Sequence, residues 1–463
     1  MKKYLWTTVF CFMLISSLLL GCAPSAIVMD TPRSEEPSPE SNGTQTAVPQ
    51  DMFTIQTDEE FIQPISVLYQ AFYGDDSPTF VESNGDLYVG RMDQFAGDHP
   101  NVHASFMPGA VLTAKRENEE VGKFIDFAVS LEGQKLLINS GELPGEITIT
   151  DQVGNDVTIK QPVERVISSY GPTTAIVYSI GMKDLLVSAS YLGARDPLGS
   201  RVMAEIDPRF SEIMGDEKFS QQEFNIEEAA KLNPDLILTS ARSAWLDIAS
   251  ELDISLFLYE AESIERLKEA VLLTGQLFGP QSHATAQALI SYFDSTVSKI
   301  QEQTSQFPQE DLPRILFTGT EPLRVVSGDM YQTQLIEAAG GISVSKELSG
   351  YWNDVNLEEV VIWDPDIILV PPYGGATVEA ITESPEWQIL EAVQAGRVYQ
   401  MPKLVVPWDT PAPDSILGIV WMAGLFHPGL IGLDCSQEAD YFYNIFYQYE
   451  IPMELASDIC AYD

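Results

Sequence analysis

The chain has 463 residues, and 68 acidic against 25 basic side chains give a formal net charge of −43. This balance argues against nucleic acid as a partner, because binding a phosphate backbone requires clustered Lys and Arg. With 45% hydrophobic and 10% aromatic residues the chain has ample material for buried cores, which argues against global disorder, and its length favours two or three domains.

The N-terminus has the pattern of a secretory signal. Lys2 and Lys3 precede an apolar stretch too short for a comfortable bilayer span, which ends in Leu19-Leu20-Gly21-Cys22. This ending resembles the lipobox of bacterial lipoproteins, and the resemblance implies that Cys22 is lipidated. An ordinary signal peptide or an uncleaved anchor is the alternative. We expect an extracytoplasmic protein held to the cell membrane by lipid, on a Gram-positive surface or in a Gram-negative periplasm.

Residues 23–50 are rich in Pro, Ser, Thr, Glu and Gly and predict a flexible linker. Among the four cysteines, Cys11 leaves with the signal and Cys22 takes the lipid. Cys435 and Cys460 then remain as one pair for a disulfide in an oxidising compartment, with two free buried thiols as the alternative.

Neither a metal site nor an enzyme active site is predicted. The four histidines show no zinc-ligand spacing, and no nucleophile or acid–base constellation stands in its required context. We therefore expect no catalytic residue and no resident cofactor.

One segment of the chain is repeated. The fourteen residues from Asn225 to Leu238 recur from Asn356 to Leu369, with seven identities at an offset of 131. Each copy reads as an Asn N-cap, a short helix with acids in its first turn, a Pro-Asp stop and an apolar strand. The repeat predicts two α/β lobes of like construction, against the alternative of chance similarity between two generic units.

A long amphipathic helix is predicted between the lobes. Apolar residues from Leu289 to Ile300 fall on one helical face, and Gly279-Pro280 separates this helix from the preceding one. The predicted order is a signal peptide (1–22), a linker (23–50), a small α/β appendage (51–146), binding lobe 1 (147–280), an interlobe helix (281–307), binding lobe 2 (308–430) and a C-terminal tail packed on a lobe (431–463).

Residues 147–430 resemble the iron-siderophore and vitamin B12 class of substrate-binding proteins that serve ATP-binding-cassette (ABC) importers. The resemblance rests on residues 151–158, Arg165 to Ser168, the two repeat units, Ala338-Ala339-Gly340-Gly341 and Gly396 to Tyr399. It implies a class III solute-binding fold, with the ligand held between two α/β lobes joined by one long helix. It also implies an ABC permease and its ATPase as partners, and a monomeric binding protein.

The same resemblance implies that Glu227 and Glu358 dock onto basic residues of the permease. The repeat places both acids at equivalent helix starts, as a two-point footprint on a pseudo-symmetric partner requires. The alternative is that they only complement the helix dipoles.

Candidate ligand residues follow the strands, because loops at the carboxyl ends of parallel strands line the crevice of open α/β lobes. Aromatic rings with a few arginines suit an anionic chelate or oxyanion. Arg242 is the strongest candidate, with a salt bridge as its alternative, and each aromatic has core or surface filler as its alternative. The candidates are Tyr170, Tyr191, Arg195, Arg242, Trp245, Arg324, Tyr351, Trp352, Tyr373 and Trp408.

Two predicted parts flank the lobes. Residues 124–141 are similar to the tail of molybdate- and sulfate-type binding proteins, but too few residues precede them for a complete domain of that class. We expect a small α/β appendage there. The tail after residue 430 carries seven aromatics from Tyr441 to Tyr462 and is expected to pack on a lobe.

These observations predict a lipid-anchored receptor that captures a metal chelate, such as a ferric siderophore, haem or corrinoid, for an ABC importer. A molybdate or tungstate binder of the same fold is one alternative. A surface scaffold or sensor that has lost uptake is another, because a fold does not by itself specify a function.

Overall fold

The computed structural model describes residues 53–74, 77–92, 104–115, 118–190, 196–214, 219–249 and 253–462. The chain divides into two units, residues 1–50 and 51–463, and every described residue belongs to the second. The expected signal peptide, Cys22 and the linker lie outside the described residues, as do Tyr191 and Arg195.

Lobe 1 is built on a parallel sheet in the order β10-β9-β7-β8. Its strands are almost wholly apolar because helices cover both faces. A β5–β6 hairpin precedes the sheet. The elements are β5 (Glu146–Thr150), β6 (Asp156–Lys160), β7 (Val166–Ser168), α4 (Gly171–Ser179), β8 (Leu186–Ala189), α5 (Pro197–Ile206), α6 (Phe210–Ile213), α7 (Ile226–Leu232), β9 (Leu236–Ser240), α8 (Leu246–Ala249), β10 (Ser255–Tyr259) and α9 (Ile264–Leu277).

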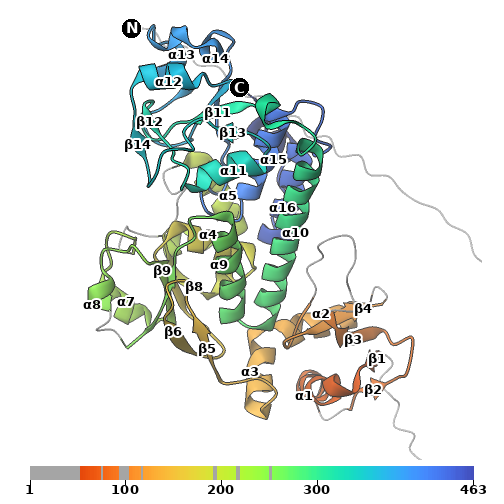
Figure 1. Ribbon diagram of the computed structural model, residues 1–463. Helices are drawn as coiled ribbons and strands as arrows, with labels where there is room; N and C mark the ends of the chain where they lie inside the picture. The colour runs from red at the N-terminus through yellow and green to blue at the C-terminus, as the bar shows by residue number, and fades with distance from the viewer. Residues whose placement is uncertain are drawn as a thin grey trace, which may run out of the picture. The chain divides into compact units, whose positions relative to one another are not determined.

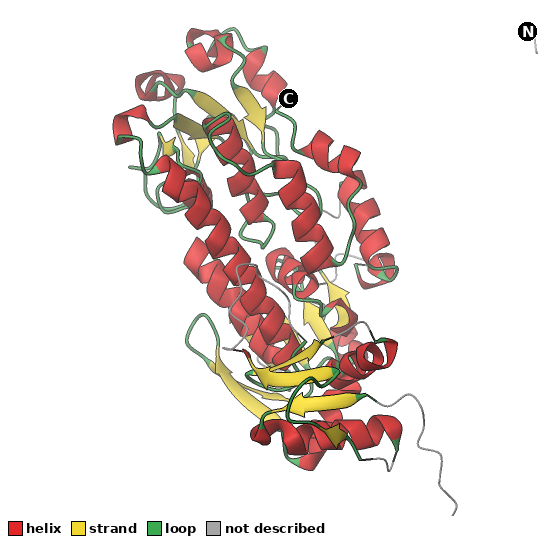
Figure 2. Ribbon diagram, turned by 90° about the vertical axis from the view of Figure 1, so that its right-hand side faces the viewer, coloured by secondary structure: helices red, strands yellow, loops and turns green. Residues whose placement is uncertain are grey.

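Lobe 2 repeats this construction with a parallel sheet in the order β13-β11-β15-β16 and a small antiparallel pair, β12–β14. Seen from the side, helices flank the sheets (Figure 2). The elements are β11 (Arg314–Phe317), β12 (Arg324–Val325), α11 (Tyr331–Ala338), β13 (Ile342–Ser343), β14 (Asn353–Asp354), α12 (Leu357–Trp363), β15 (Ile367–Val370), α13 (Val378–Thr382), α14 (Glu391–Gln394), β16 (Val398–Gln400) and α15 (Ser415–Phe426).

One long helix, α10 (Pro280–Thr304), carries the chain from lobe 1 to lobe 2 (Figure 1). It begins one residue earlier than predicted, because Pro occupies the first helical position, where its missing N–H costs nothing. The apolar face is buried at Leu289, Phe293 and Ile300 and packs against α9, α11 and α15. Two α/β lobes joined by one long helix are therefore present, as the sequence predicts.

The two repeat units form matching structures. Asn225 and Asn356 cap α7 and α12 by accepting the backbone N–H of Glu228 and Glu359. The Pro-Asp aspartate of each copy then accepts a backbone N–H at the start of the neighbouring strand. Asp235 accepts from Arg165, just before β7, and Asp366 accepts from Arg314, the first residue of β11, each at 2.8 Å. The Asp residues thus attach each helix–strand unit to its sheet.

The appendage is a small α/β unit with its own apolar core. Its sheet has the order β2-β1-β3-β4, in which only the β3–β4 pair is antiparallel. Polar contacts join it to the rest, among them the Ser105 N–H that donates to Gln281 Oε1 at 2.7 Å and the pairing of Lys135 with Glu164 at 2.8 Å. The elements are β1 (Thr54–Thr57), α1 (Ile62–Tyr73), β2 (Thr79–Phe80), β3 (Leu87–Arg91), β4 (Ala110–Ala114), α2 (Glu119–Val129) and α3 (Leu131–Ser140).

The C-terminal tail forms α16 (Cys435–Tyr447) and α17 (Met453–Ile459), and a disulfide joins Cys435 to Cys460. It contacts both lobes rather than the single lobe that was expected. Helix α16 packs against α15 of lobe 2 and α4 of lobe 1, and the Tyr449 hydroxyl donates to Glu205 of lobe 1 at 2.9 Å.

A buried carboxylate anchors this tail. Asp414, at the start of α15, is fully buried and accepts the hydroxyls of Tyr443 and Tyr447 at 2.7 and 2.6 Å. Burial raises the pKa of Asp414 from 3.8 to about 6, although both hydroxyls favour the charged form.

No helix among the described residues has the length and hydrophobicity needed to cross a membrane.

The raised pKa of Asp414 predicts a pH-dependent contribution to stability. Between about pH 4 and 6 the folded state holds a proton that the unfolded state has lost, so this contribution decreases as the pH rises. Relative to Asp414→Asn, the wild type should lose up to about 3 kcal/mol of unfolding free energy between pH 4 and 7. Urea unfolding at each pH measures the difference. Asp458→Asn, an exposed acid of the same tail, is the control, and a pH-independent difference for Asp414→Asn would contradict the assignment.

Candidate functional site

The carboxyl ends of the strands in both lobes open onto a cleft between the lobes. From lobe 1, the loops after β7, β9 and β10 bring Tyr170, Arg242 and Glu262 to this edge. From lobe 2, the segments after β13 and β15 bring Tyr351 and Tyr373. These loops lie where open α/β folds place their ligands.

Buried hydroxyl groups hold the lobe 1 loops in place. Ser169 Oγ donates to Thr239 Oγ1 at 2.6 Å, and Thr239 Oγ1 lies 2.7 Å from Ser243 Oγ. Thr174 Oγ1 donates to the Ser190 carbonyl at 2.6 Å, which ties the loop after β8 to the start of α4. The side chains at the cleft therefore project from loops whose buried polar groups are satisfied.

Arg242 is the centre of a cluster formed by both lobes. Its guanidinium lies 4.6 Å from the centroid of the Tyr351 ring, a cation–π contact between lobe 1 and lobe 2. Arg242 Nη1 lies 3.2 Å from Glu262 Oε1. Tyr170 is next to them: burial raises the pKa of its hydroxyl, the charge of Glu262 adds to the rise and Arg242 opposes it. The cluster combines two rings with one paired cation.

The Tyr351 loop is fixed by its own lobe. Gly350 has a φ of +83°, a left-handed conformation that favours glycine. Its N–H donates to Asp329 Oδ2 at 2.7 Å, and its carbonyl accepts Ser327 Oγ at 2.5 Å. Tyr351 is nevertheless 54% exposed, so a ligand in the cleft can reach its ring.

A cavity of about 530 Å³ lies between the lobes beside Tyr373. Asp196 and Pro197 of lobe 1 line it together with Tyr373 and residues 403–407 of lobe 2, and Lys403 pairs with Asp196 across it at 3.3 Å. The Tyr373 hydroxyl donates to the fully buried Asp409 at 2.6 Å. Burial raises the pKa of Asp409 to about 6, and Tyr373 opposes this rise by stabilising the charged form.

Arg324 and Trp352 lie on neighbouring segments of lobe 2. Arg324 opens β12, which pairs with β14 directly after Trp352. The Trp352 ring covers Gly319 so closely that a Cβ at Gly319 would come within 2.7 Å of it. Both side chains are half-buried. Trp352 directly follows Tyr351 in the chain, and Arg324 pairs with Asp354 of β14.

Trp245 and Trp408, both predicted as ligand residues, are core residues. Trp245 is 5% exposed, donates Nε1 to the Ser220 carbonyl at 2.8 Å and stacks on Phe224 at 4.0 Å. Trp408 has no exposed surface and donates Nε1 to the Tyr443 hydroxyl at 3.3 Å. Both were predicted because they follow a strand. That position does not distinguish a ring at the cleft from a large apolar ring that is buried in a core.

Three charged residues at the cleft were not predicted: Glu262, Asp196 and Lys403. Glu262 and Lys403 follow the ends of β10 and β16, so the strand-end rule applied to every strand would have found them. Asp196 is different, because its sequence signal is only that of a helix N-cap; its side chain accepts the Gly199 N–H.

Glu227 and Glu358 occupy equivalent places in the two lobes, in the first turns of α7 and α12. Both are exposed, and neither takes part in an ion pair within the described part of the chain. Within the same residues, no group of three or more His, Cys, Asp or Glu side chains is placed to hold a metal ion.

Comparison with known proteins agrees with this geometry. The family model "Periplasmic binding protein" matches residues 217–404. This match begins within lobe 1, contains all of α10 and ends in lobe 2, so it includes both repeat units.

Similar proteins and solved structures cover more of the chain than this match does. A Bacillus subtilis ABC transporter substrate-binding lipoprotein, uncharacterised, is 23% identical over 61% of this chain and 86% of its own length. The vitamin B12-binding protein of Yersinia pestis is 26% identical over 53% and 78%. The solved molybdate-bound periplasmic protein MolA of Haemophilus influenzae superposes with a TM-score of 0.58 at 19% identity, covering 66% of this chain and 99% of its own. The fold is that of class III solute-binding proteins.

The Arg242–Tyr351 contact between the lobes gives a testable coupling. A double-mutant cycle with Arg242→Gln and Tyr351→Leu should give a coupling of about 0.5–1 kcal/mol in the free energy of unfolding, as expected for a partly exposed cation–π pair. Tyr399→Leu replaces Tyr351→Leu in the control cycle. Equal coupling in the two cycles would show that the contact contributes nothing.

Proposed function

We propose that this protein is a lipid-anchored, extracytoplasmic substrate-binding protein that captures a metal chelate between its two lobes and delivers it to an ABC importer. The observation that carries the proposal is the Arg242 cluster, in which a guanidinium from lobe 1 meets the exposed Tyr351 ring from lobe 2. Ferric siderophores, haem and corrinoids are the chelates considered. Transport by this route involves no catalysis by the binding protein.

The charges of the cleft favour a chelate over a bare oxyanion. Glu262 lies 3.2 Å from Arg242, and Asp196 lies 3.3 Å from Lys403. A small dianion would need several hydrogen-bond donors that are not already paired with a carboxylate. Glu262 and Asp196 would also repel its negative charge. A large chelate instead places an apolar periphery on Tyr170, Tyr351 and Trp352, while its polar groups exchange with the existing ion pairs.

Arg324 and Tyr373 are proposed as further ligand contacts, and so are Tyr191 and Arg195, which lie outside the described residues. We retain Glu227 and Glu358 as permease-docking residues and Cys22 as the lipidated residue. Their support is the equivalent exposed position of the two acids and the lipobox-like sequence before Cys22.

A thermal-shift screen of the full chain tests the ligand class. The panel contains ferric siderophores, haem, cobalamin, molybdate and tungstate. A ligand at 100 times its dissociation constant adds about 2.7 kcal/mol to the stability of the native state, which is readily detected. We expect a shift with a chelate that Arg242→Gln abolishes and that Arg201→Gln, an exposed arginine of the same lobe, leaves intact. A shift with molybdate or tungstate alone would change the class to oxyanions, and no shift at all would favour the scaffold alternative.

Charge reversal tests the docking residues separately from ligand binding. Glu227→Lys with Glu358→Lys should abolish uptake of the chelate in cells, because like charges then face the basic residues of the permease. Affinity for the chelate itself should not change. Glu212→Lys with Glu386→Lys makes the same charge change at exposed positions, one in each lobe, and should leave uptake intact. Unchanged uptake in the first double variant would refute docking through these acids.

A further inference from the structure

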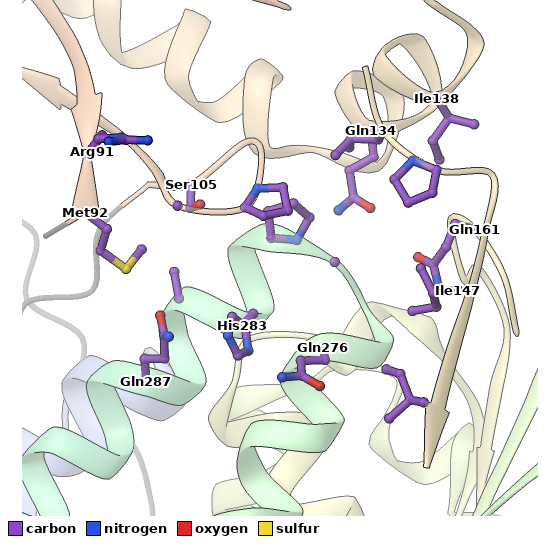
Figure 3. Close-up of a pocket in the computed structure, with 18 residues that line it drawn as sticks. Arg91, Met92, Ser105, Gln134, Ile138, Ile147, Gln161, Gln276, His283 and Gln287 are labelled. Atoms are coloured by element: carbon purple, nitrogen blue, oxygen red, sulfur yellow. The ribbon is translucent and has the colours of Figure 1, made fainter. Parts of the chain in front are cut away.

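A second cavity, of about 790 Å³, lies outside the interlobe cleft, where the appendage meets lobe 1 and the start of α10 (Figure 3). Met92 and Ser105 of the appendage line one side, and Gln134 and Ile138 of α3 line another. The wall opposite includes His283 of α10. The cavity shares no lining residue with the one beside Tyr373. Its volume is within the range of about 300–1,000 Å³ that is usual for small-molecule sites.

The described lining contains almost no charge. Arg91 is its single charged residue, and Arg91 Nε already lies 2.8 Å from Glu60 Oε1. His283 is neutral near pH 7, because burial lowers its pKa further below 6.5. The chain has 68 acidic residues, yet none of them is in the described lining of this cavity, so a bound cation would have no carboxylate partner there. In the same lining a bound anion would find only Arg91, whose charge is already paired with Glu60. The lining therefore selects against ions of either sign.

Side-chain amides supply the polar character of this cavity. Among the residues that the structure describes, the amides of Gln134, Gln276 and Gln287 have no hydrogen-bond partner, while Gln161 donates to the Leu277 carbonyl at 3.1 Å. Figure 3 shows Gln134, Gln276 and Gln287 around the same space. Each amide offers a donor and an acceptor, so uncharged polar groups of either kind can be bound.

Apolar residues form the rest of the wall. Ile138 of α3 and Ile147 of β5 face the cavity together with several prolines and Leu143. The backbone of Gly279 passes so close that a Cβ there would lie 2.7 Å from Gln134 Oε1, and its φ is +104°. Glycine at this position thus permits the close approach of α3 to the start of α10.

We propose that this cavity is a second binding site, for an uncharged and largely apolar small molecule that carries at least one hydrogen-bonding group. The appendage and lobe 1 each supply part of the wall, so the site exists only when the appendage is docked. It gives residues 53–146 a binding role that is independent of the cleft ligand.

Photoaffinity labelling of the full chain tests the site and its charge selectivity together. The probe is an aryl trifluoromethyl-diazirine with a hydroxymethyl group, compared with the same compound bearing a carboxylate. After irradiation, adducts are mapped by peptide mass spectrometry. Saturable labelling by the neutral probe is expected in residues 134–149 and 276–287. The carboxylate probe should label these segments about tenfold less, equivalent to about 1.4 kcal/mol.

Two variants fill the cavity without disturbing a core, because the residues they replace are exposed. Gln276→Trp and Gln287→Trp should each reduce labelling of these segments by about tenfold, since the indole occupies the space of the probe. Gln301→Trp makes the same change at an exposed position near the other end of α10 and should have no effect. Labelling that does not saturate, that is equal for both probes, or that survives both filling variants would overturn the proposal.

Discussion

The packing of α10 is the constraint on which the arrangement of the lobes depends. A helix of 25 residues is about 37 Å long, and this one carries the only covalent connection between the lobe sheets within the described chain. Its buried residues lie against α9 of lobe 1 and against α11 and α15 of lobe 2. A rotation of one lobe therefore has to repack an apolar interface, which is costlier than bending a loop.

The C-terminal tail adds a second connection. Helix α16 lies against α4, α10 and α15, and the Tyr292 hydroxyl of α10 donates to Glu438 of α16 at 2.7 Å. The buried Asp414 fixes this tail through two tyrosine hydroxyls. With both lobes attached to the same helices, capture of a ligand is expected to rely on small rotations and on side-chain exchange at the cleft.

The charge balance of the chain also shapes the cleft. Bases are few, and both Arg242 and Lys403 are engaged with a carboxylate and, in the case of Arg242, with an aromatic ring. A bound ligand must therefore replace contacts that already exist, so its affinity depends on the difference between two sets of polar interactions. The cavity beside the appendage follows the opposite principle, because its described lining excludes nearly all charge.

Local sequence patterns determined most of the fold. Asparagine caps, Pro-Asp stops, apolar strands and the spacing along α10 act over a few residues, so the two lobes, the long helix and the equivalent positions of Glu227 and Glu358 could be predicted. Contacts between distant segments were decided only in the tertiary structure. Trp245, Trp408 and Tyr170 all follow strands, yet Trp245 and Trp408 are buried in cores and Tyr170 is at the cleft. The difference arises because burial depends on which distant segments pack over each loop. The meeting of Arg242 with Tyr351, the tail across both lobes and the cavity beside the appendage have the same origin, since each joins residues that no local pattern relates.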